Sequence, residues 1–210
     1  MAQETQNRNL SSFTGVKSAE GIDVYLKKGD KESARVEVYG TSLENVITEV
    51  SGNYLKVHMR DEVRGHVNVK VYVTYVKVDK LSASSAGSIF SEGTIDANSM
   101  EISSSSAANI EIALNASGEV EISSSSAGEV EVKGKARSLR AEASSAGEID
   151  AYDLEAEKVH AEASSAGSIK VNVTNELDAH ASSGGGIRYR GNPDRSNTNS
   201  SSGGSVKKSN

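Results

Sequence analysis

The chain contains 210 residues with a formal net charge of −6, one proline and no cysteine, and 36% of its residues are apolar. Without cysteine it forms no disulfide and no thiolate metal site. Acidic and basic residues are interspersed without a basic stripe that would neutralise a phosphate backbone, so we expect no nucleic-acid partner. No apolar run approaches the ~20 residues of a transmembrane helix, so we also expect no membrane-spanning segment.

Residues 1–9 are polar and hold no apolar stretch of the kind found in signal peptides. We expect this segment to be a disordered N-terminus, because terminal residues are poorly ordered unless something ties them down. The sequence by itself leaves two locations open. The protein is either cytoplasmic, or exported with a signal that is not part of this sequence.

Residues 10–80 contain several segments in which apolar and polar side chains alternate. This period of two predicts β-strands with one buried face. The segments lie at 22–26, 36–38, 55–59 and 67–73, and glycine-containing turns separate them at 28–30, 39–41 and 51–53. We interpret the region as β-rich structure that continues into, or caps, the repeats that follow, because an uncovered strand edge invites aggregation.

A six-residue unit, Ser-Ser-(Ala/Gly)-(Gly/Ala)-x-(Ile/Val), recurs through the rest of the chain every 18 to 21 residues. Its first serines are Ser84, Ser105, Ser125, Ser144, Ser164, Ser182 and Ser201. This constant spacing, without helical patterns in between, excludes βαβ units and predicts coils that stack with their strands parallel. A flexible serine-rich linker does not fit, because linkers do not keep apolar residues in register.

Apolar residues keep fixed positions relative to each unit. Five residues after the first serine every copy has Ile or Val, and mainly polar residues separate the apolar positions. This alternation on both sides of a turn predicts two strands per coil with one face inward. The expected fold is therefore all-β, a single-stranded parallel β-helix (solenoid) over 81–206 with coils of about 20 residues and an N-terminal cap. The expected buried stack is Ile89, Ile110, Val130, Ile149, Ile169 and Ile187.

The fourth residue of the unit is glycine in all copies but one. We expect it to supply a positive φ for the turn, or to lie where a Cβ has no space, so that corners stack at ~4.8 Å. The corner glycines are Gly87, Gly128, Gly147, Gly167 and Gly185. In the last copy Ser196 and Thr198 replace apolar residues, which predicts a capping coil or a frayed end, followed by a tail at 207–210.

Together these features resemble the family described as putative auto-transporter adhesin, head GIN domain, whose members are secreted or cell-envelope proteins of Gram-negative bacteria. The resemblance covers about residues 10–190, and the repeats are its most specific part. It is also carried by the segments Phe13-Thr14-Gly15-Val16, Gly21-Ile22-Asp23-Val24 and Val36-Glu37-Val38-Tyr39-Gly40. It implies a β-helical fold and an extracytoplasmic location, in the periplasm, on the outer membrane surface or outside the cell. It implies no particular activity.

The register also predicts which outward side chains lie side by side. His160 and Asp178 stand four residues before the first serine of adjacent coils, and Glu162 and His180 stand two before it. These four should form a two-by-two patch with ~5 Å between direct neighbours. Two imidazoles and two carboxylates could bind a divalent transition metal. A solvated face with alternating charges needs no ion, and we favour this second interpretation, so we expect no cofactor.

A second outward column contains the acids Glu111, Glu131 and Asp150, followed by Lys170 and Arg188. Like charges at strand spacing repel one another, so a calcium ion would stabilise the column. Water and salt screen the same repulsion without a specific site. We expect screening alone.

Two classes of function remain. Paired carboxylates on a parallel β-helix also fit a pectinase-like, carbohydrate-active enzyme. Coils of about 20 residues leave no long loops to build a cleft, and outward aromatics such as Phe90 and Tyr152 are few. We therefore expect a non-catalytic, extracytoplasmic module of the structural or adhesion type, which recognises a glycan or protein surface through flat solenoid faces. Self-association into a homo-oligomer is a further expectation.

Overall fold

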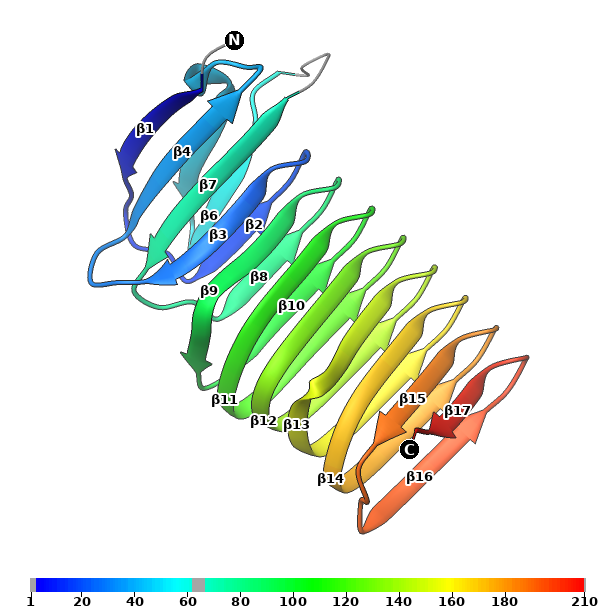
Figure 1. Cartoon of the computed structure of the whole chain (residues 1–210). Coiled ribbons are helices and arrows are strands. Elements are labelled where there is room, and N and C mark those ends of the chain that lie inside the picture. Colours follow the sequence, from blue (N-terminus) through cyan, green and yellow to red (C-terminus); the bar gives the residue numbers. More distant parts are fainter. Residues whose placement is uncertain (1–2, 62–66, 210) are drawn as a thin grey trace.

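The computed structural model describes residues 3–61 and 67–209 as an elongated stack of β-coils (Figure 1). All of the strands in this part of the chain join one sheet, which winds around a narrow core. Successive coils pair through parallel strands that are in register next to the corners, with register shifts between the corners. The predicted β-solenoid is confirmed.

The strands fall into two groups. The N-terminal group is β1 (Glu4–Asn9), β2 (Gly15–Ser18), β3 (Asp23–Lys28), β4 (Ser33–Tyr39), the short 3-10 helix η1 (Leu43–Asn45), β5 (Val46–Ser51), β6 (Tyr54–Met59) and β7 (Asn68–Tyr75). The repeat group is β8 (Lys80–Ala83), β9 (Ser88–Ala97), β10 (Met100–Ser104), β11 (Asn109–Ser124), β12 (Glu129–Ala143), β13 (Glu148–Ala163), β14 (Ser168–Ala181), β15 (Gly186–Arg190), β16 (Arg195–Ser200) and β17 (Ser205–Lys208). From β11 to β14 one long strand runs from each corner to the next.

The N-terminal group contains a coil that the repeat unit does not reveal. Strands β2 and β3 pair in parallel with β6 and β7 on one side and with β8 and β9 on the other. The corner of this coil lies at 19–22, with positive φ at Glu20 and Gly21. The outermost strands, β6 and β7, are covered by β5 and β4 in antiparallel orientation. The region at 10–80 therefore both continues the solenoid and covers its end, which removes an open parallel edge.

Residues 4–9, which we expected to be disordered, instead form β1 along the edge of β4. Almost every side chain of β1 is exposed, so its sequence lacks the apolar alternation that predicts a strand. Its backbone hydrogen bonds and one side chain hold it in place. The Arg8 guanidinium donates to the carbonyls of Val46, at 2.6 Å, and Leu43, at 2.7 Å. Burial lowers the pKa of Arg8.

The core is one continuous cluster that runs from Phe13 to Ile187. The predicted stack of Ile and Val residues is confirmed, because each of its six members is fully buried. The repeat coils before the last one add mainly aliphatic and alanine side chains, and each packs against its counterparts in the neighbouring coils. The core thus grows by one similar layer per coil.

The corners show which of the two expected roles of glycine applies, and it is the lack of space for a Cβ rather than a positive φ. In each corner the second and third residues have positive φ, for example 48° at Ser145 and 61° at Ala146, whereas Gly147 does not. The amide of Gly147 donates to the carbonyl of Ser144 at 2.8 Å, which closes a type I′ turn. Glycine is needed for space. A Cβ on Gly147 would lie 2.4 Å from the carbonyl oxygen of Ser124 in the preceding coil.

The last coil forms despite its polar side chains. Strand β16 pairs with β14, and β17 pairs with β15. Ser196 and Thr198 are exposed, so this coil is held by backbone pairing rather than by burial. Residues 207 and 208, which we assigned to a tail, belong to β17. The frayed end that we had left open does not occur at 195–208.

Two neighbouring substitutions test the roles of the corner residues. Replacing Gly147 by valine forces a side chain against the carbonyl of Ser124 and should destabilise the protein by about 1–3 kcal/mol. Replacing the exposed Ala146 by glycine removes left-handed strain without loss of packing and should stabilise it by about 0.5–1 kcal/mol. Urea unfolding would measure both changes. Shifts of the same sign, or a wild-type midpoint for Gly147→Val, would contradict this account of the corner.

Candidate functional site

The solenoid presents two long outward faces, one on each side of the corners. We call the face formed by the strand segments before each corner the pre-corner face, and the opposite one the post-corner face. Next to the corners the outward side chains of successive coils stand in straight columns, because these segments of the coils pair in register. Columns of this kind hold polar side chains at a spacing of ~4.8 Å.

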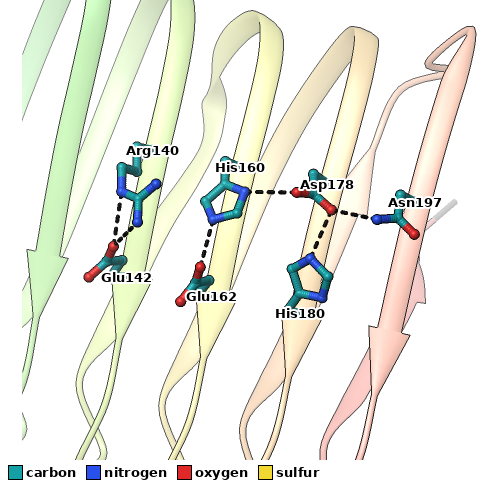
Figure 2. A network of polar contacts seen from close by, with 7 residues as sticks. All are labelled: Arg140, Glu142, His160, Glu162, Asp178, His180 and Asn197. Atoms are coloured by element: carbon teal, nitrogen blue, oxygen red, sulfur yellow. Dashed lines mark hydrogen bonds and ion pairs between the residues drawn. The ribbon is translucent and has the colours of Figure 1, made fainter.

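The pre-corner face carries two neighbouring groups of paired side chains, which together we call the polar patch (Figure 2). The polar patch consists of Arg140, Glu142, His160, Glu162, Asp178, His180 and Asn197. Its residues come from β12, β13, β14 and β16. The predicted two-by-two arrangement is confirmed, because His160 stands beside Asp178 and Glu162 beside His180 in the register of β13 and β14.

Asp178 lies at the centre of the polar patch. One of its oxygens lies 3.0 Å from Nδ1 of His160, and the other lies 2.9 Å from Nε2 of His180. The side-chain amide of Asn197 donates to the second oxygen at 2.9 Å. Nε2 of His160 lies 2.7 Å from Glu162. These contacts hold the side chains in fixed positions even though all of them reach solvent.

The charges around Asp178 favour its ionised form. Partial burial would by itself raise the pKa of Asp178, but the hydrogen bond from His160 and the charges of His180 and His160 outweigh it. The net result is a pKa below the usual value of 3.8. The carboxylate is therefore a permanent acceptor at the centre of the polar patch at neutral pH.

The donor atoms of the polar patch pair with one another rather than converge on a common point. Both ring nitrogens of His160 are engaged by carboxylates. Across residues 3–61 and 67–209, no group of three or more histidine, aspartate or glutamate side chains is arranged to hold a metal ion. A metal would have to displace two of these contacts before it could bind His160 and His180.

The post-corner face carries the acidic column. Glu111, Glu131 and Asp150 are direct register partners, and Lys170 follows in the next coil. Lys170 donates to Asp150 at 2.9 Å and to Glu148 at 3.0 Å. Burial and the charges of Glu111 and Asp150 raise the pKa of Glu131. Lys170 thus neutralises part of the acidic column from within the chain.

The structure adds an aromatic row that sequence reasoning missed. The rings of Tyr72, Tyr25 and Phe90 stack along the post-corner face, with ring centroids 5.0 and 5.2 Å apart. The guanidinium of Arg35 covers the face of Tyr72 at 4.1 Å. Only the coil formed by β2 and β3 brings these rings together, and its corner lacks the repeat unit. The rings cover one another's faces, so the row supports packing rather than a sugar-stacking platform.

A groove of about 870 Å³ also escaped the sequence reasoning. It lies where the segment after β7 meets the edge of the first repeat coils, and we call it the junction groove. Asp79 and Asp96 supply carboxylates to its wall, and Asn98, Lys77 and Lys135 lie beside them. The groove arises because the chain leaves the regular coil edge at the N-terminal cap. No repeat pattern could reveal it, since it is a departure from the repeat.

The polar patch predicts a pH effect that a variant can isolate. Because the folded pKa of Asp178 is depressed, its contribution to stability is present above the unfolded pKa near 3.8 and is lost as the pH falls through the lower folded value. Asp178→Asn should reduce the unfolding free energy at pH 6 by less than about 1 kcal/mol, because the contacts of Asp178 with His160 and His180 are exposed to solvent. The difference from wild type should vanish at about pH 2. Denaturation across this range measures it, and a difference that grows in acid would contradict the assignment.

Comparison with known proteins supports the fold on independent grounds. A search of curated proteins finds no significant match. Among solved structures, a putative adhesin from Bacteroides fragilis NCTC 9343 superposes with a TM-score of 0.86 at 18% identity, over 99% of this chain and 97% of that one. A putative lipid binding protein from Parabacteroides distasonis ATCC 8503 gives 0.74 at 20% identity, over 99% and 97%. At these identities the likeness concerns the fold alone.

In the part of the chain that the structure describes, no helix is long and apolar enough to cross a bilayer.

The family is established by sequence. A family model described as putative auto-transporter adhesin, head GIN domain, matches residues 12–193. This match covers most of the chain and includes both the N-terminal cap and the repeats. The protein therefore belongs to the auto-transporter adhesin head GIN domain family.

Proposed function

We propose that this protein is a non-catalytic, extracytoplasmic binding module that recognises a glycan through the polar patch on its pre-corner face. The observation that carries the proposal is the chain of contacts through Asp178, which fixes two imidazoles and two carboxylates on a rigid sheet. Side chains that are already ordered lose little conformational entropy when a ligand binds. The extracytoplasmic location is supported by the family to which the chain belongs.

The chemistry of this face favours a glycan over a protein partner. Stable protein interfaces are built around buried aromatic or aliphatic anchors. Among the described residues the exposed large apolar side chains are Tyr39 and Val76, and both lie outside the polar patch. Carboxylates, imidazoles and an amide instead match the closely spaced hydroxyl groups of a sugar. The adhesin descriptions of the family and of a structural neighbour agree with recognition of an outside surface.

The junction groove supports a second candidate, a carbohydrate-active enzyme. It contains two carboxylates, Asp79 and Asp96, and glycoside hydrolysis uses a pair of such groups. Lys77 lies 3.9 Å from Asp79, and Asn115 donates weakly to Asp96 at 3.5 Å. Two carboxylates that line a groove are the minimum that glycoside hydrolysis requires. The polar patch is favoured because five of its side chains form one connected network, whereas the groove side chains make few contacts. The five are His160, Glu162, Asp178, His180 and Asn197.

A glycan array combined with a polysaccharide degradation assay separates the two candidates. Wild type should bind a subset of glycans, and Glu162→Gln combined with Asp178→Asn should reduce that binding at least about tenfold, because charge-assisted hydrogen bonds are lost. Asp79→Asn combined with Asp96→Asn serves as the matched control and should bind like wild type. No sugar chain should be shortened. Cleavage that the groove variant abolishes would overturn the proposal in favour of the enzyme.

A further inference from the structure

The outward column on the post-corner face carries acids in its first half and bases in its second half. When the column is read from its other end, the sign of the charge at each position is therefore inverted. We call it the charge column. From the N-terminal side it reads Glu111, Glu131, Asp150, Lys170, Arg188 and Lys207. Each member is the direct register partner of the next. Three acids are thus followed by three bases at the constant coil spacing of ~4.8 Å.

The outer members of the charge column form no ion pair with the residues that the structure describes. At its centre Lys170 pairs with Asp150 at 2.9 Å. Neither Glu111 nor Glu131 forms an ion pair with any other described residue, and the same holds for Arg188 and Lys207 on the basic side, within residues 3–61 and 67–209. Like charges therefore stand next to one another along both halves, which is unfavourable at strand spacing. Opposite charges from outside the chain would relieve both halves together.

A second copy of this chain presents the required charges in the required order. A two-fold axis that lies in the plane between the two faces, parallel to the strands and level with the gap between Asp150 and Lys170, turns one face onto the other. It reverses the column and places acids opposite bases. We propose that two copies of this chain dock through their post-corner faces about this axis. The facing pairs are Asp150 with Lys170, Glu131 with Arg188, and Glu111 with Lys207, each formed twice. Such an interface is isologous, because the same surface is used by both subunits.

The neighbouring columns meet their own copies across the same axis. Two positions before the charge column, Glu129 faces Gly186 and Glu148 faces Ser168, so acids lie opposite small uncharged residues that leave room for approach. Two positions after it, Lys133 faces Arg190, so this edge of the contact carries one like-charged pair. The edge before the charge column therefore favours close approach more than the edge after it.

The size of the face indicates how tight the dimer is. Six coils at ~4.8 Å and about five residues at ~3.3 Å give a contact of roughly 480 Å² per molecule. Stable complexes bury about 800 Å² per partner, so this area corresponds to a weak, reversible dimer. The coils stack in a straight row (Figure 1), but β13 is irregular between Ala151 and Glu155, so the contact is made by the residues next to the corners. The stability of the dimer should depend on these ion pairs and should therefore fall as salt screens them.

Sedimentation equilibrium tests the proposal directly. Wild type should dimerise at high micromolar concentration in about 20 mM salt and dissociate in about 500 mM salt, because the Debye length shrinks from roughly 20 Å to a few ångströms. Arg188→Glu should weaken the dimer at least about tenfold, since two repulsive pairs replace two attractive ones. Glu131→Arg should do the same. Arg137→Glu, an equal charge reversal on an exposed residue outside the charge column, is the control and should dimerise more readily than Arg188→Glu.

Mixing the two single variants gives the sharpest result. A heterodimer of Glu131→Arg with Arg188→Glu contains only opposite-charge pairs at these positions, so the mixture should regain the dimer that each variant loses alone. Circular dichroism melts would establish that each variant is folded before mixing. A wild type that remains monomeric in low salt, a dimer indifferent to Arg188→Glu, or a mixture that stays monomeric would each overturn the proposal.

Discussion

Backbone hydrogen bonds between neighbouring coils fix the distance from each residue to its counterpart in the next coil. At the corners, for example, the amide of Ser144 donates to the carbonyl of Ser124 at 3.0 Å, and the amide of Ala146 donates to Ser165 at 3.1 Å. Each side chain of a middle coil therefore lies next to the side chains at the same position in the two neighbouring coils. A residue type is acceptable only if it can stack at ~4.8 Å, which selects small corner residues and inward aliphatic residues of similar volume.

The same spacing organises the outer faces. Outward side chains are held in columns, and they meet neighbours from other coils whether those neighbours attract or repel. On the pre-corner face the result is the polar patch, in which Asp178 joins two imidazoles. On the post-corner face it is the charge column, where a single intramolecular pair at Asp150 and Lys170 separates two like-charged halves. Binding and self-association would thus use different faces of one scaffold.

The sequence predicts whatever the repeat determines. The spacing of the serines yields the solenoid, the buried stack through Ile149, and the pairing of His160 with Asp178, because identical coils have identical registers. It fails where the chain departs from the repeat. Strand β1 has no apolar pattern, the corner at 19–22 lacks the serines, and the junction groove lies at an irregular edge. The sequence left two roles open for the corner glycine, because close approach of two coils and a positive φ both favour this residue.

The central claim is that alternate residues point into a core shared by all coils. It is tested most directly by comparing the thermal melts of two variants that introduce the same side chain at adjacent positions, Ile169→Asp and Ser168→Asp. Ile169 is fully buried, and an unpaired carboxylate there costs several kcal/mol, so that variant should be unfolded at room temperature. Ser168 points outward, and its variant should melt within a few degrees of wild type. Wild-type-like melting of Ile169→Asp would contradict the account.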